Sequence, residues 1–172
     1  MAEIPAIKFA QRHKPLHLHS TQTIGTINNT QPISIGVRES IVYSPDEKAP
    51  LRSFYVDISI IEDKKASALS SIPESDIPEI LAALGGFSGV ITAQQSFVLR
   101  HAFFNATPFI RFSLMDGYKG SLGFGVQIYN SDVNRDANLS ASSFGNADPL
   151  LVNTIKMLRQ AQDMISKVAK SS

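Results

Sequence analysis

Apolar and polar residues alternate along much of the chain, a pattern typical of strands that bury one face of a sheet. The clearest stretch runs from Phe54 to Ile60, where every second residue is apolar. A similar alternation from Ile33 to Ile41 predicts a second strand. Just after Phe54–Ile60, the charged segment Glu62–Lys65 predicts a hairpin turn that leads into the next strand. Further strands are expected at 16–19, 66–72, 90–104, 109–115, 122–128 and 139–144.

Two segments change to the spacing of an amphipathic helix. The first follows Asp76, which with Glu79 has the spacing of a capping box, and Gly85-Gly86 is expected to end it. The second follows Asp148 and Pro149, a residue common in the first turn of helices. Its apolar stripe is wide enough to need a partner surface. The stripe consists of Leu151, Ile155, Leu158, Ala161, Ile165 and Val168.

The order of these elements, several strands followed by one helix, occurs twice. Phe54–Ile58 aligns with Phe124–Ile128, and an Asp-capped helix follows each stretch. We therefore predict an α+β fold with two antiparallel β-sheets, two helices packed on one side, and an internal pseudo-twofold of the type (ββββα)×2. Residues 1–14 are expected to form a flexible arm, and residues 15–172 a single domain with repeats at 15–86 and 87–172. The alternative is that half-buried strands simply resemble one another.

One set of residues resembles the Whirly family of single-stranded DNA-binding proteins and the related guide-RNA-binding proteins. It comprises Ser53-Phe54-Tyr55-Val56-Asp57-Ile58-Ser59, the hairpin at Asp63-Lys64-Lys65, and Ile72-Pro73 before the Asp76 helix. The resemblance implies two copies of a four-stranded sheet plus helix, assembly into oligomers, and binding of single strands. The family's Lys-Gly-Lys-Ala-Ala-Leu motif is absent, and Tyr118-Lys119-Gly120-Ser121-Leu122 matches part of it only in the second half.

Composition narrows the class of protein. The chain has 172 residues, of which 43% are apolar and 18% charged, so a packed core is expected. It contains no cysteine, which excludes disulfides and thiolate metal sites. No apolar run approaches the length of a membrane span, so we expect a cytoplasmic protein without a membrane partner. The net charge of +1 argues against binding of duplex DNA, which depends on many phosphate contacts. It argues less against binding of single strands, because base stacking contributes to their affinity.

Residues out of phase with the apolar set are expected on the sheet faces away from the helices. Aromatic rings there would stack on unpaired bases, while cationic groups would meet phosphates. Alternatively, such residues only cover the sheet or form a subunit interface, where Tyr and Arg are enriched. The candidate nucleic-acid-binding residues are Arg38, Tyr55, Phe109, Arg111, Lys119 and Tyr129.

No arrangement of residues predicts an active site, a cofactor site or a metal site. His17 and His19 would share one strand face, near His13, but the sequence marks no further ligand for a metal. His101 lies in an apolar stretch and is expected to be structural. The glycines lack dinucleotide-binding spacing, and the acids show no pairing for acid–base catalysis. We therefore expect no enzyme and no cofactor.

The function that this reasoning favours is non-enzymatic binding of single-stranded nucleic acid, DNA rather than RNA, through an exposed sheet face. The expected partners are single-stranded DNA or RNA and further copies of this chain in a homo-oligomer. The alternative is a structural or regulatory homo-oligomer with no affinity for nucleic acid. A third possibility, an enzyme with a pocket between the two halves, needs a concave site that sequence does not reveal.

Overall fold

The computed structural model describes residues 15–44, 48–92, 101–116, 122–129, 138–143 and 147–171. The strands are β1 (Leu16–Ile27), β2 (Ile33–Tyr43), β3 (Leu51–Glu62), β4 (Lys65–Pro73), β5 (His101–Thr107), β6 (Ile110–Asp116), β7 (Leu122–Tyr129) and β8 (Asn138–Ser143). The helical elements are a single 3₁₀ turn, η1 (Glu74–Asp76), and the helices α2 (Ile77–Thr92) and α3 (Ala147–Lys170).

The strands form two antiparallel sheets, which confirms the predicted α+β class. The first sheet has the order β1-β2-β3-β4 and the second β5-β6-β7-β8. Four strands followed by a helix therefore occur twice along the chain. The two aligned stretches, 54–58 and 124–128, are both central strands whose apolar residues are buried. The pseudo-twofold relation between the halves stays a prediction.

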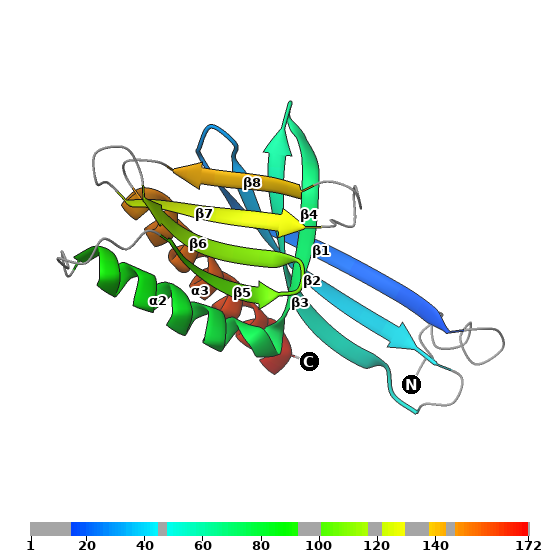
Figure 1. Ribbon diagram of the computed structural model, residues 1–172. Helices are drawn as coiled ribbons and strands as arrows, with labels where there is room; N and C mark the ends of the chain where they lie inside the picture. The colour runs from blue at the N-terminus through cyan, green and yellow to red at the C-terminus, as the bar shows by residue number, and fades with distance from the viewer. Residues whose placement is uncertain are drawn as a thin grey trace.

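Helix α3 lies between the two sheets and joins them into one body. In Figure 1 the second sheet lies in front of α3 and the first sheet crosses behind it, while α2, which contacts α3, runs below the second sheet. The last helix, α3, contacts β1 and β2 of the first sheet as well as β7 of the second. One apolar core therefore contains residues from both sheets and both helices, including Ile35, Val56, Leu84, Phe112 and Leu158.

Three aromatic rings fix the second sheet against α2. Phe112 and Phe124, on neighbouring strands β6 and β7, stack with centroids 6.1 Å apart and an interplanar angle of 8°. Phe87 of α2 meets the Phe124 ring edge-on at 6.4 Å. Offset-stacked and edge-on pairs are the favourable arrangements of aromatic rings.

This packing explains where the sequence predictions of helix α2 were wrong. The helix does not end at Gly85-Gly86 but continues through both glycines to Thr92, so Val90–Thr92 are helical rather than extended. Glycine inside a helix costs about 1 kcal/mol relative to alanine. Helices in proteins are stabilised mainly by tertiary packing, and Phe87, directly after the two glycines, packs against Phe124 of the second sheet. The boundary expected between residues 86 and 87 therefore falls inside a helix.

The start of α2 also differs from the expected capping box. The chain enters the helix through η1, so Asp76 ends a 3₁₀ turn instead of capping α2. The hydrogen bond described for its carboxylate comes from the Ser75 hydroxyl at 3.3 Å. Such turns are frequent at helix N-termini.

The predicted charged hairpin is confirmed as a two-residue turn between β3 and β4. Glu62 pairs with Lys65, and the two residues between them, Asp63 and Lys64, have φ values of 50° and 64°. Positive φ at both central residues is the mark of a type I′ turn, whose twist matches that of the strands. Lys64 adopts this conformation with a Cβ atom, which is unfavourable compared with glycine.

Replacing Lys64 with glycine should therefore stabilise the fold. We expect the free energy of unfolding to rise by about 0.5–1 kcal/mol, since relief of the left-handed strain exceeds the entropy cost of glycine. Urea denaturation measures the change. Lys64→Ala is the matched control, because it removes the same charge but keeps the Cβ atom. An equal gain in both variants would assign the effect to charge and contradict the backbone explanation.

One end of the first sheet extends beyond the core. In Figure 1, β1, β2 and β3 project together past the second sheet and the helices. The side chains of β1 from His17 to Thr23 are exposed, and Leu51 at the start of β3 is 54% exposed. Leu18, paired with Ile41, is 41% exposed. Among the described residues, this end is a three-stranded sheet without a covering layer.

Candidate nucleic-acid interface

The candidate residues on strands lie on the sheet faces that point away from the core, as the strand alternation predicts; these are Arg38, Tyr55, Arg111 and Tyr129. On β6, Ile110, Phe112 and Leu114 are fully buried, so Arg111 between them belongs to the opposite face. On β3, the burial of Phe54 and Val56 places Tyr55 on the opposite face in the same way. Arginine side chains lie beside aromatic rings on both sheets, but their side-chain partners differ in charge.

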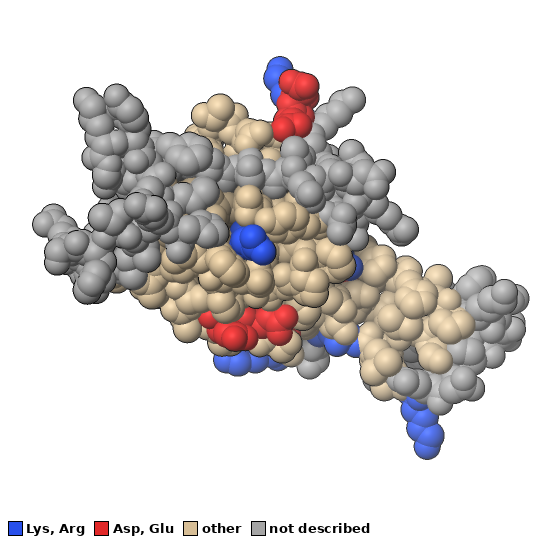
Figure 2. Space-filling view, in the orientation of Figure 1, with Lys and Arg blue, Asp and Glu red and all other residues tan. Residues whose placement is uncertain are grey.

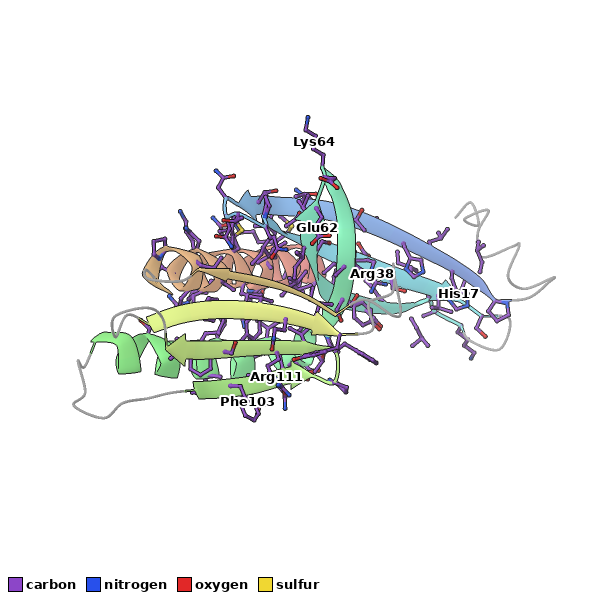
Figure 3. All side chains as sticks on the ribbon, turned by 45° about the horizontal axis from the view of Figure 1, so that its top comes forward. His17, Arg38, Glu62, Lys64, Phe103 and Arg111 are labelled. Atoms are coloured by element: carbon purple, nitrogen blue, oxygen red, sulfur yellow. The ribbon has the colours of Figure 1, made fainter. Side chains whose placement is uncertain are left out.

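On the second sheet, the guanidinium group of Arg111 lies between two aromatic rings. Its Cζ atom is 4.7 Å from the ring centroid of Phe103 on β5 and 5.5 Å from that of Tyr129 on β7. Figure 3 shows Phe103 and Arg111 side by side on their neighbouring strands. Arginine over an aromatic face is attracted by the ring quadrupole, by about 0.5–1 kcal/mol at exposed sites. We call Arg111, Phe103, Tyr129 and Asn105 the Arg111 platform.

Two hydrogen bonds hold the side chains of this platform in place. The Nε–H of Arg111 donates to Oδ1 of Asn105 at 2.8 Å, and Asn105 is its direct neighbour across the β5–β6 pair. The hydroxyl of Tyr129 donates to Oε1 of Gln127 at 2.8 Å. Gln127 lies opposite Arg111 on β7. Three adjacent strands therefore contribute to one fixed arrangement of cation, amide and rings.

On the first sheet, Arg38 and Tyr55 are direct cross-strand neighbours, with the guanidinium 4.6 Å from the ring centroid. The Nε–H of Arg38 donates to the Asp57 carboxylate at 3.1 Å. Its Nη2 donates to the Ser71 hydroxyl at 3.0 Å, and that hydroxyl donates to the same carboxylate at 2.6 Å. We call Arg38, Tyr55, Asp57 and Ser71 the Arg38 cluster. In this cluster the Asp57 carboxylate compensates the positive charge of the arginine.

The second arginine on this sheet, Arg52, is compensated in the same way. Its Nε–H donates to the carboxylate of Glu39, and its guanidinium lies 5.1 Å from the Phe54 ring centroid. By contrast, no carboxylate among the described residues lies within 4.0 Å of Arg111. Its side-chain partner is a neutral amide. The outer face of the second sheet therefore keeps a full positive charge beside its aromatic rings.

The distribution of charged residues on the surface agrees with an uncompensated positive charge on the second sheet. Figure 2 views the molecule onto the second sheet and shows a basic group near the centre of this face. Among the described residues, the acidic groups in this view lie below the sheet and at the β3–β4 hairpin at the top. An anionic strand crossing the centre of this face would thus avoid the acidic groups seen in this view.

The structure brings only some of the predicted site residues together. Arg38 and Tyr55 meet on the first sheet, and Arg111 and Tyr129 meet on the second. Phe109 is 46% exposed in the turn that precedes β6, outside both clusters. Lys119 lies outside the described residues.

Sequence reasoning missed Phe103 and Asn105. Phe103 lies in the apolar stretch 90–104 and Asn105 just beyond it. Because polar and apolar residues do not alternate regularly in this stretch, the stretch by itself does not show which side chains face the core. The register gives that phase: Phe104 pairs with the buried Phe112, which puts Phe103 on the outer face, where it is 54% exposed. The available signal was the polar Asn105: in a strand, residues two apart share a face, so Phe103 belongs to the same outer face as Asn105 and Phe104 to the inner face.

An open pocket of about 620 Å³ adjoins the Arg111 platform at the turn between β5 and β6. This volume lies within the range of about 300–1,000 Å³ that is usual for small-molecule sites. Its polar lining comes from Asn105, Thr107, Arg111 and Tyr129, and its apolar lining from Ala106, Pro108 and Ile110.

The histidine cluster does not form a metal site within the described part of the chain. His17 is exposed on the projecting end of β1, as Figure 3 shows, and His19 is exposed on the same strand. His13 lies outside the described residues. No group of three or more histidines and acids in the described ranges is placed to hold a metal ion.

Comparison with known proteins assigns no family to this chain. The sequence matches no protein-family model and no curated protein sequence. In the ranges that the structure describes, no helix has the length and apolar character needed to span a membrane.

Proposed function

We propose that this protein binds single-stranded nucleic acid through the outer face of its second sheet. The observation that carries the proposal is the Arg111 guanidinium, held between the rings of Phe103 and Tyr129 without a described carboxylate partner. Rings on a sheet surface stack with unpaired bases at about 1–3 kcal/mol per base. The arginine adds attraction for the backbone phosphates.

The chemistry favours single strands over duplexes. The chain has a net charge of only +1, whereas duplex binding depends on many phosphate contacts. Bases of a single strand are free to stack on the exposed Phe103 ring. The expected preference for DNA over RNA and the expected homo-oligomeric state remain parts of the proposal.

The two arginine clusters provide a matched test. We expect Arg111→Gln to weaken binding of a fluorescent oligo-dT strand and to reduce the slope of log affinity against log salt by about 0.7. Arg38→Gln should leave both unchanged, because Asp57 already compensates that charge. Fluorescence anisotropy at several salt concentrations measures both, with oligo-U as the RNA counterpart. No binding by the wild type at low salt, or equal losses in the two variants, would contradict the proposal.

Stacking should be separable from charge in the same assay. Phe103→Ala removes a ring from the platform but no charge, so affinity should fall by about 1–3 kcal/mol while the salt slope stays constant. Phe109→Ala is the control, since Phe109 is similarly exposed but lies outside the platform. A loss from Phe109→Ala as large as that from Phe103→Ala would show that the strand does not depend on the platform.

A structural homo-oligomer without nucleic-acid affinity is the second candidate function. The observation that favours it is the uncovered end of the first sheet, where Leu18 and Leu51 are exposed. An open strand edge with apolar residues is a surface on which a second chain can pair. Sedimentation of the wild type and of Leu18→Glu tests this: self-association that the charge abolishes, together with no oligonucleotide binding, would favour this candidate.

A further inference from the structure

The side chains that line the pocket beside the Arg111 platform include several with hydrogen-bond donors to spare. Arg111 uses its Nε–H on Asn105, which leaves its two terminal amino groups without a described acceptor. Asn105 uses its amide oxygen in the same bond, so its NH₂ group remains to donate. Both residues line the pocket.

Thr107 supplies a further donor at the turn between β5 and β6. Its Oγ1 accepts the backbone N–H groups of Phe109 and Ile110, each at 3.1 Å. With its oxygen occupied in this way, the hydroxyl hydrogen of Thr107 is available to a ligand. Tyr129 is the exception in the lining, because its hydroxyl donates to Gln127 and keeps its oxygen as an acceptor.

No carboxylate side chain is among the described residues that line the pocket. The pocket is thus lined by residues that carry a guanidinium cation, an amide NH₂ and a hydroxyl, next to the rings that Arg111 contacts. A ligand that complements this set has several acceptor oxygens and a negative charge. Arginine binds phosphate oxygens in paired hydrogen bonds, which suits it to this role.

We infer that this pocket binds the phosphate group of a nucleotide whose base stacks on the Tyr129 ring. The inference rests on the proposed function and assigns its anchoring point. Two sources present the same chemistry: a phosphodiester within a strand and a phosphomonoester at a strand end. Asn105 then determines the affinity, because its neutral amide holds Arg111 without compensating its charge, whereas Asp57 compensates Arg38.

Titration of the ¹⁵N-labelled wild-type protein with dTMP and with thymidine tests the pocket without requiring strand binding. The Asn105 NH₂ and Arg111 Nε–H signals should shift with dTMP and much less with thymidine, which lacks the phosphate. Equal shifts with both compounds, or no shift with either, would overturn the inference. This result is independent of the oligonucleotide assay, so failure of the pocket and failure of the proposed function are distinguishable.

The decisive variant is Asn105→Asp, which keeps an oxygen for the Arg111 Nε–H but places a carboxylate against it. We expect dTMP and oligo-dT affinity to fall by about tenfold or more. Asp57→Asn, the reverse exchange in the Arg38 cluster, is the matched control and should leave the dTMP shifts at Asn105 and Arg111 unchanged. Oligo-dT and dTMP binding by Asn105→Asp at wild-type affinity would overturn the role of this pocket.

Oligonucleotides with and without a 5′ or 3′ phosphate identify the source of the phosphate. Tighter binding of a phosphorylated end, lost in Asn105→Asp, would support the phosphomonoester. Equal binding of all strands, again lost in Asn105→Asp, would support an internal phosphodiester. Retention of either pattern in Asn105→Asp would contradict the role of this pocket.

Discussion

Replacing Phe124 with alanine should lower the free energy of unfolding by about 3–5 kcal/mol. Phe124 is fully buried, and its ring contacts those of Phe112 on β6 and Phe87 on α2. Its removal leaves a cavity at the point where the second sheet joins a helix. Urea denaturation followed by far-ultraviolet circular dichroism measures the loss.

Phe103→Ala is the matched control for this variant, because it removes the same ring from the same sheet at a site that is 54% exposed. Its effect on stability should stay within about 0.5 kcal/mol. Comparable losses in the two variants would show that Phe124 does not occupy the packed core.

Leu158→Ala should destabilise the protein by about 2–5 kcal/mol. Leu158 is fully buried on α3, the helix that contacts strands of both sheets, so the cavity would open at their junction. Chemical denaturation measures this change as well.

Val152→Ala on the same helix provides the comparison, since Val152 is 52% exposed. We expect its effect to be within about 0.5 kcal/mol of zero. A loss below half a kcal/mol for Leu158→Ala would contradict the packing of α3 between the sheets.

The strands were predictable because burial of one sheet face requires apolar residues at every second position, a pattern visible in the sequence. The alternation from Phe54 to Ile60 gave both the strand and the face on which Tyr55 lies, and the structure confirms both. The length of α2 was not predictable in this way. Its glycines remain helical because of Phe87, whose partner Phe124 lies far away in the sequence.

The candidate site could be predicted only as a set of side chains on outer faces. What distinguishes the two arginines is the identity of the partner that each meets across the sheet. Arg38 meets Asp57, 19 positions along the chain, and Arg111 meets Asn105, six positions away. Strand register decides these pairings, and it depends on turn geometry and on which face is buried, so the positions of the residues alone do not give it.

The position of α3 has a consequence for the order in which the chain can fold during synthesis. Ile33 and Ile35 lie on a sheet that is synthesised before α3, the helix that contacts β1 and β2. Until α3 is synthesised, part of the first sheet's apolar surface lacks this cover. Contacts between such distant segments form slowly, and uncovered apolar sheets tend to aggregate. Nascent chains of this protein are therefore expected to depend on a chaperone until α3 is released.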